Sequence, residues 1–142
     1  MQDKKINKET IVPDAHLENA YHFIAWIDEK EMDFLLLPDD ADLEQTIALA
    51  NKVLDNFPTY EKNARQRIIE DNLPLYNENC RMDNEPAITE TAFSNNLTLQ
   101  TISITSHFLV EFYYHENGMF GDHSLIAQAF DGEHFDESTV FG

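Results

Sequence analysis

A change in hydrophobic period near residue 39 constrains the fold of this chain more than any other feature. Before it, residues 20–28 and 31–38 are rich in aromatic and β-branched residues, and they predict two strands joined by a tight turn. After it, apolar residues recur at alternating steps of four and three, as on one face of a helix. These residues are Leu43, Ile47, Ala50, Leu54 and Phe57. The pattern therefore predicts a hairpin followed by an amphipathic helix.

The segment after this first helix predicts more helix. Asp39 to Asp42 supply capping and first-turn acids for the first helix, and Asn56 and Pro58 end it. Residues 59–73 predict a second helix, with Pro74 near its end or at a kink. Its expected inward residues are Tyr60, Ala64 and Ile68, with Leu75 as a further candidate. A loop over residues 77–86 and a short helical turn over 88–96, capped by Thr89 or Thr91, follow.

The last third of the chain returns to strand patterns. We expect strands at residues 97–106, 107–115 and 123–131. Asn117-Gly118 is the strongest hairpin signal in the chain, and Asp131-Gly132 marks a further turn. Strand runs that flank consecutive helices are typical of α+β proteins. We therefore predict one domain over residues 1–142, with 1–18 as a loosely ordered N-terminal arm. Its fold would be a mostly antiparallel sheet of about five strands with two to three helices on one face.

Charge limits the possible partners. The formal net charge is −18, and residues 87–142 hold eight acids without a single lysine or arginine. Such a surface repels phosphate backbones and anionic membranes, so we expect neither as a direct partner. A basic protein would be attracted instead, at a rate that falls as salt rises. The alternative is that the acidity serves solubility alone.

The remaining composition indicates a cytoplasmic protein. Cys80 is the only cysteine, no run of about 18 apolar residues is present, and the N-terminus lacks the apolar region of a secretory signal. These features predict a reducing compartment without a disulfide framework. The sequence does not indicate an oligomeric state.

Few residues suggest catalysis or metal binding. Asp122, His123 and Ser124 are the residue types of a hydrolytic triad, but adjacent residues in a strand point to opposite faces. The histidines lack the paired spacing of zinc sites. One alternative stays open, a hydrolase or metal-dependent enzyme that uses His115, His123 and His134 at one sheet end. Otherwise we expect no catalytic residue, no metal and no cofactor.

Acids interleaved with aromatic residues favour protein binding. We expect them to gather at one end of the sheet, where charge would steer a basic partner and aromatic rings would supply buried contact. The candidate partner-binding residues are Glu111, Tyr113, Glu116, Phe120, Asp122, His123, Asp131, Glu133, Asp136 and Glu137. Tyr114 belongs to the same stretch.

The segment EFYYHENGMFGDHSLIAQAFDG and the closing STVFG resemble the small acidic immunity proteins of bacterial polymorphic-toxin and contact-dependent growth inhibition systems. The resemblance covers about a quarter of the chain. It implies a non-enzymatic inhibitor that binds a cognate toxin domain, often a basic nuclease, in the cytosol. A nucleic-acid-mimicking regulator of a host protein is the alternative that the same electrostatics allow.

Overall fold

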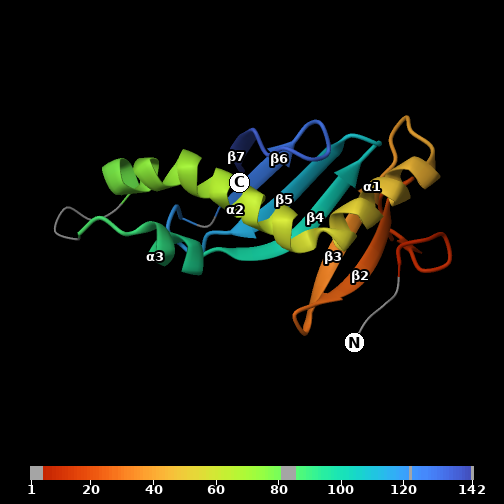
Figure 1. Cartoon of the computed structure of the whole chain (residues 1–142), viewed down its shortest axis with the longest axis horizontal. Coiled ribbons are helices and arrows are strands. Elements are labelled where there is room, and N and C mark those ends of the chain that lie inside the picture. Colours follow the sequence, from red (N-terminus) through yellow and green to blue (C-terminus); the bar gives the residue numbers. More distant parts are fainter. Residues whose placement is uncertain (1–4, 81–85, 122, 142) are drawn as a thin grey trace.

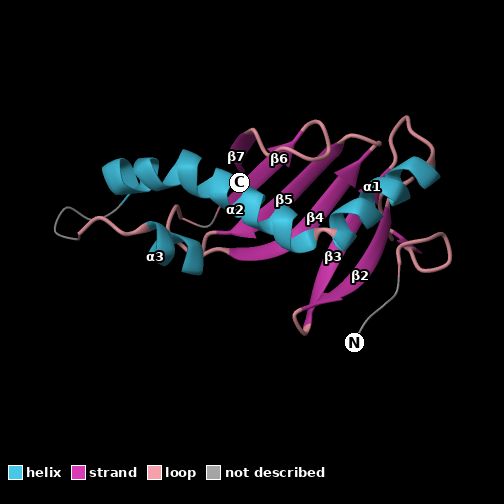
Figure 2. Ribbon diagram, in the orientation of Figure 1, coloured by secondary structure: helices cyan, strands magenta, loops and turns pink. Residues whose placement is uncertain are grey.

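The computed structural model describes residues 5–80, 86–121 and 123–141. Figures 1 and 2 show one sheet with helices packed on one side of it. The strands are β1 (Val12–Pro13), β2 (Tyr21–Ile27), β3 (Lys30–Leu37), β4 (Thr98–Thr105), β5 (Leu109–His115), β6 (Ser124–Ala129) and β7 (Glu137–Phe141). The helices are α1 (Leu43–Asp55), α2 (Phe57–Leu75), the π-helical turn η1 (Tyr76–Cys80) and α3 (Glu90–Asn95).

The seven strands lie in the sheet in sequence order, from β1 to β7. Every neighbouring pair is antiparallel except β3 and β4, which are parallel. The parallel pair follows from the connection between them, because α1, α2 and α3 carry the chain back across the sheet before β4 begins. The α+β class is confirmed. The sheet is larger than the predicted five strands, and it is mixed.

The two strands that the prediction missed lie at the edges of the sheet. β1 is only two residues long and contains Pro13, so it has no alternating pattern to detect. It lies in the N-terminal arm, which is ordered from Lys5 onward by contacts such as the hydrogen bond from Ile6 N–H to Asn51 Oδ1 (3.0 Å). β7 lies beyond the last predicted strand, although Thr139, Val140 and Phe141 have the composition of a strand.

The predicted β2–β3 turn is present and tight. Ile27 pairs with Lys30, and the two residues between them, Asp28 and Glu29, have φ angles of 52° and 64°. Positive φ at both central residues is the type I′ geometry, which matches the twist of the flanking strands. Glycine or asparagine normally occupies such positions, so Glu29 is held in a backbone conformation that its side chain disfavours.

The helices begin and end near the predicted residues. Gln45 Oε1 accepts the Asp42 backbone N–H at 3.1 Å at the start of α1, and Thr89 Oγ1 accepts the Ala92 N–H at 3.1 Å at the start of α3. Pro74 lies inside the last turn of α2. The expectation that Leu75 faces inward is wrong, because its side chain is exposed past the end of the sheet.

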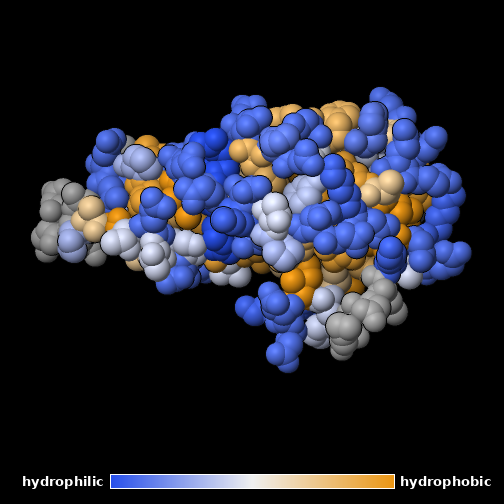
Figure 3. Space-filling model, viewed as in Figure 1, coloured by the Kyte–Doolittle hydropathy of each residue, from blue (hydrophilic) through white to orange (hydrophobic). Residues whose placement is uncertain are grey.

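The core lies between the helices and one face of the sheet. Ile47, Ala50, Tyr60, Ala64 and Ile68 are buried as predicted. The sheet contributes the fully buried side chains of Phe34, Leu36, Ile102, Ile104, Val110, Phe112, Tyr114 and Leu125. Each such large apolar side chain stabilises the fold by about 1.5–3 kcal/mol. The outer surface of the helices, which faces the viewer in Figure 3, is mostly hydrophilic.

None of the helices in the described part of the chain has the length and apolar character that crossing a lipid bilayer requires.

Candidate functional site

The second face of the sheet, which we call the open face, has no described helix packed against it. Paired residues of neighbouring strands lie on the same face, so the strand register identifies its rows. One row runs from β2 to β7 through His22, Leu35, Ser103, Glu111, Gln128 and Glu137. The next row runs through Ile24, Asp33, Thr101, Tyr113, Ile126 and Thr139. The residues between these positions face the helices.

The open face carries acids and, among its described residues, no lysine or arginine. Its strands present Glu31, Asp33, Glu111 and Glu137. The described lysines and arginines lie elsewhere. Lys5 and Lys8 are in the N-terminal arm, Lys30 is at the β2–β3 turn, and Lys52, Lys62, Arg65 and Arg67 are on the helices. The acids of the open face therefore have no lysine or arginine beside them among the described strand residues of that face.

A line of hydrogen bonds orders the centre of the open face. Gln128 Nε2 donates to Glu111 Oε2 at 2.9 Å, and Thr139 Oγ1 donates to Gln128 Oε1 at 2.8 Å. Tyr113 lies beside this line, and its burial, followed by the negative charge of Glu111, raises the pKa of its phenol. The Tyr113 hydroxyl therefore stays protonated at neutral pH, and the acids are presented in one ordered arrangement.

Large apolar side chains lie exposed on the same sheet. Trp26 is 51% exposed on β2, Val12 is 62% exposed on β1, and Phe141 is 66% exposed on β7. Exposed aromatic residues beside charges are typical of the anchoring residues of protein interfaces. The sequence prediction did not include Trp26. The strand pattern of residues 20–28 held the necessary signal, because Phe23 and Ala25 alternate with Ile24 and Trp26.

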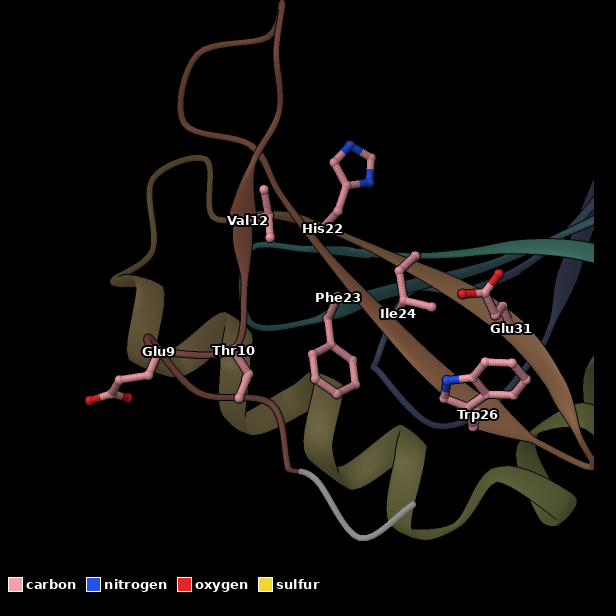
Figure 4. A pocket seen from close by; sticks show the side chains of 8 residues that line it. All are labelled: Glu9, Thr10, Val12, His22, Phe23, Ile24, Trp26 and Glu31. Atoms are coloured by element: carbon pink, nitrogen blue, oxygen red, sulfur yellow. The ribbon is translucent and has the colours of Figure 1, made fainter. Parts of the chain in front are cut away.

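The open face ends in a cleft of about 600 Å³ beside β2 (Figure 4). Val12 and Ile24 line it together with Trp26, and Glu31 lies next to Trp26 across the β2–β3 pair. Glu9 and Thr10 line it from the N-terminal arm.

His22, at the rim of this cleft, connects three segments. Its Nε2 lies 2.6 Å from Asp14 Oδ1, and its Nδ1 lies 3.0 Å from Asp33 Oδ1. The hydrogen bond with Asp14, and then the one with Asp33, raises the pKa of His22. The hydrogen bond from His22 in turn lowers the pKa of Asp14 to about 2. The His22 imidazole thus holds Asp14, which follows β1, against β2 and β3.

The predicted binding residues do not gather at one sheet end, so that expectation is wrong. Glu111, Tyr113 and Glu137 lie on the open face. Phe120 is partly buried instead, with its ring centroid 5.7 Å from that of Tyr76 and 6.3 Å from that of Phe93. Asp122 lies outside the described residues, and His123 is half-buried just before β6.

Glu116 is a structural residue rather than a surface acid. Its side chain is 0% exposed, and its two carboxylate oxygens accept the backbone N–H groups of Gly118 and Phe120. The carboxylate therefore satisfies two amides of the β5–β6 loop and fixes the position of Phe120. Tyr114 is also internal, since its hydroxyl donates to Glu61 and its ring is fully buried.

The other predicted acids lie at the far end of β6, in the connection to β7. Asp131 accepts the backbone N–H of Glu133 at 2.9 Å and that of His134 at 2.7 Å, which holds the turn together. These bonds, first that from the His134 backbone, keep the pKa of Asp131 below its ordinary value. Glu133 pairs with Lys52 of α1 at 3.3 Å, and Asp136 is exposed.

The expectation that His115, His123 and His134 cluster at one sheet end is also wrong, because these histidines do not all lie at the same end of the sheet. His115 pairs with Ser124 at one end of β6, whereas His134 follows Ala129 at the other end. The six residues of β6 lie between His115 and His134 and span roughly 20 Å. Within the described ranges, no group of three or more His, Cys, Asp or Glu side chains has a geometry that holds a metal ion.

These features define an α+β protein with a helix-covered face and an acidic, aromatic open face. Residues 17–139 match the family DUF2262, described as an uncharacterized protein conserved in bacteria, and the chain belongs to that family. Comparisons with curated proteins and with solved structures found no match.

Proposed function

We propose that this protein is a non-enzymatic immunity protein that binds a cognate basic toxin domain in the bacterial cytosol. The open face would cover the active site or substrate groove of the toxin. One observation carries the proposal: the uncovered side of the sheet combines acids with exposed aromatic side chains and has no described lysine or arginine. The resemblance of residues 111–132 to immunity proteins supports it.

The dimensions of the open face suit a protein partner. Seven strands about 4.8 Å apart span roughly 30 Å, and strands of this length span roughly 20 Å. The resulting area of about 600 Å² approaches the ~800 Å² that each partner contributes to a standard interface. Loops at the rim would supply the remainder.

The electrostatics indicate the class of toxin. A nuclease binds the phosphates of its substrate through lysine and arginine side chains, and these would meet Glu31, Glu111 and Glu137 in the complex. The acids then occupy positions that phosphates take in the substrate complex. Long-range attraction would also accelerate association, which an inhibitor needs if it is to act before the toxin does.

Charge reversal on the open face tests the proposal. The C-terminal domain of the protein encoded immediately upstream is the probe, and Glu111→Lys with Glu137→Lys is the test variant. We expect association to slow at least about tenfold and the Kd to rise at least about tenfold. The matched control is Asp55→Lys with Asp40→Lys, which makes the same total change of charge at two exposed positions, at the end of α1 and in the β3–α1 connection. Equal effects of the test and control variants would refute the open face as the contact surface.

A further inference from the structure

The outer edge of β2 is only partly paired. β1 pairs with Tyr21 and His22 and with no other residue of β2. The Asp14 N–H donates to Ala20 C=O at 2.8 Å, which shows that Ala20 directs its backbone groups outward. Alternate residues of an antiparallel strand direct their backbone groups to the same side, so Ile24 and Trp26 also point outward. Among the described residues, no strand pairs with them there.

The unpaired edge is bounded at both ends. The hydrogen bonds of His22 to Asp14 and Asp33 hold β1 in place at one end. The type I′ turn at Asp28 and Glu29 closes the other end. This leaves an accessible stretch of β2 from residue 23 to residue 27. It matches the length of an ordinary short strand.

The cleft of about 600 Å³ lies directly beside this edge. Val12, Ile24 and Trp26 provide its apolar surface, and Glu9 and Glu31 provide its charge. The described lining includes no lysine or arginine. An aromatic ring face next to carboxylates is an environment that favours a guanidinium or ammonium group.

We propose that an extended basic segment of the partner protein adds to the sheet as a strand along the edge of β2. Its backbone hydrogen bonds with Ile24 and Trp26, and one of its arginine or lysine side chains enters the cleft against Trp26. Strand addition of this kind derives affinity from main-chain hydrogen bonds and specificity from side-chain pockets. The inference rests on the proposed function, because it assumes that the partner is a basic protein.

The charge of the cleft argues for this occupant over a second copy of the chain. Each copy would bring Glu9 and Glu31 toward the same edge, and like charges repel. An arginine or lysine against Trp26 instead finds the carboxylate of Glu31, whose side chain none of the described hydrogen bonds or ion pairs engages. The carboxylates of Asp14 and Asp33 are different, because both already form hydrogen bonds with His22.

Amide exchange measured by NMR tests the inference. Protein labelled with ¹⁵N is observed free and after addition of the C-terminal domain of the protein encoded immediately upstream. Trp26 is the single tryptophan, so one indole signal reports the cleft. We expect exchange of the Ile24 and Trp26 amides to slow at least about tenfold in the complex, and the indole signal to shift.

Two variants separate the contributions of the backbone and of the side chains to binding. Ile24→Pro removes the outward N–H while leaving the β2–β3 hydrogen bonds in place, and Ile24→Val is its matched control. Trp26→Ala removes the aromatic surface without a change to the backbone. We expect Ile24→Pro and Trp26→Ala each to weaken binding about tenfold or more, and Ile24→Val to leave it unchanged.

The outcomes distinguish the two proposals. Strand addition at β2 is overturned if a complex forms but the Ile24 and Trp26 amides exchange as in the free protein. It is overturned equally if the β7 amides are protected instead. In both cases the proposed function still stands. Dimerisation of the free protein through the β2 edge also overturns the inference. The absence of any complex overturns both proposals.

Discussion

The buried carboxylate of Glu116 permits a quantitative prediction about stability. It accepts the backbone N–H groups of Gly118 and Phe120, and its side chain is fully buried. Hydrogen bonds to charged groups contribute about 1.5–3 kcal/mol each, and removal of the shared acceptor leaves both amides unsatisfied. Relief of the buried charge offsets part of this loss. We therefore expect Glu116→Ala to lower the free energy of unfolding by about 2–4 kcal/mol.

Glu116→Gln gives a graded comparison. The amide oxygen of glutamine replaces one carboxylate oxygen as an acceptor, whereas its amide nitrogen faces a backbone N–H donor. We therefore expect the free energy of unfolding to fall by about 1–2 kcal/mol. Urea denaturation measures both values, because an m-value near 2 kcal/mol/M converts them to midpoint shifts of about 0.5–2 M. Exchange of the Gly118 and Phe120 amides should accelerate in both variants.

The exposed Asp136 supplies the control, since Asp136→Ala should change stability by no more than about 0.5 kcal/mol. The reasoning is refuted if Glu116→Ala has an effect as small as this control. It is refuted equally if the amide of Phe120 exchanges at an unaltered rate.

Three further predictions concern the scaffold. Because the pKa of His22 is raised, its hydrogen bond to Asp14 stabilises the fold fully below pH 6.5, and the contribution is lost as pH rises through the raised value. Thermal unfolding of the wild type and His22→Gln should therefore differ most near pH 5, and the difference should shrink as pH rises through the raised pKa of His22; a constant difference would contradict this. Glu29→Gly should raise stability by about 1 kcal/mol in thermal unfolding, because glycine accommodates the positive φ of the turn; a lower melting temperature would count against the type I′ assignment. Tyr114→Phe removes the donor to Glu61 and should cost about 1–2 kcal/mol in urea denaturation; an unchanged midpoint would exclude a stabilising role.

The elements that the sequence predicted are those with a strong local pattern. The period change near residue 39 placed β2, β3 and α1, and Asn56 with Pro58 placed the boundary between α1 and α2. β1 escaped detection because two residues form a strand only where a neighbouring strand pairs with them. The parallel pairing of β3 and β4 depends equally on packing, since it requires the helices to cross the sheet between the two strands.

The site was less predictable, because burial depends on contacts between distant segments. Glu116 has the local sequence of a surface loop residue, and only closure of the loop around its carboxylate buries it. His115 and His134 belong to neighbouring segments in the sequence, yet the direction of β6 places them at opposite ends of the sheet. Trp26, in contrast, was accessible to prediction from the alternation of its strand.

The central claim is that the open face binds a basic toxin domain. Calorimetric titration of this protein against the C-terminal domain of the protein encoded immediately upstream, at low and at high salt, tests it most directly. We predict a nanomolar or tighter Kd at low salt, and a Kd that rises with salt as the charges of the open face are screened. Binding that does not depend on salt would contradict the electrostatic account, and the absence of binding would contradict the immunity function.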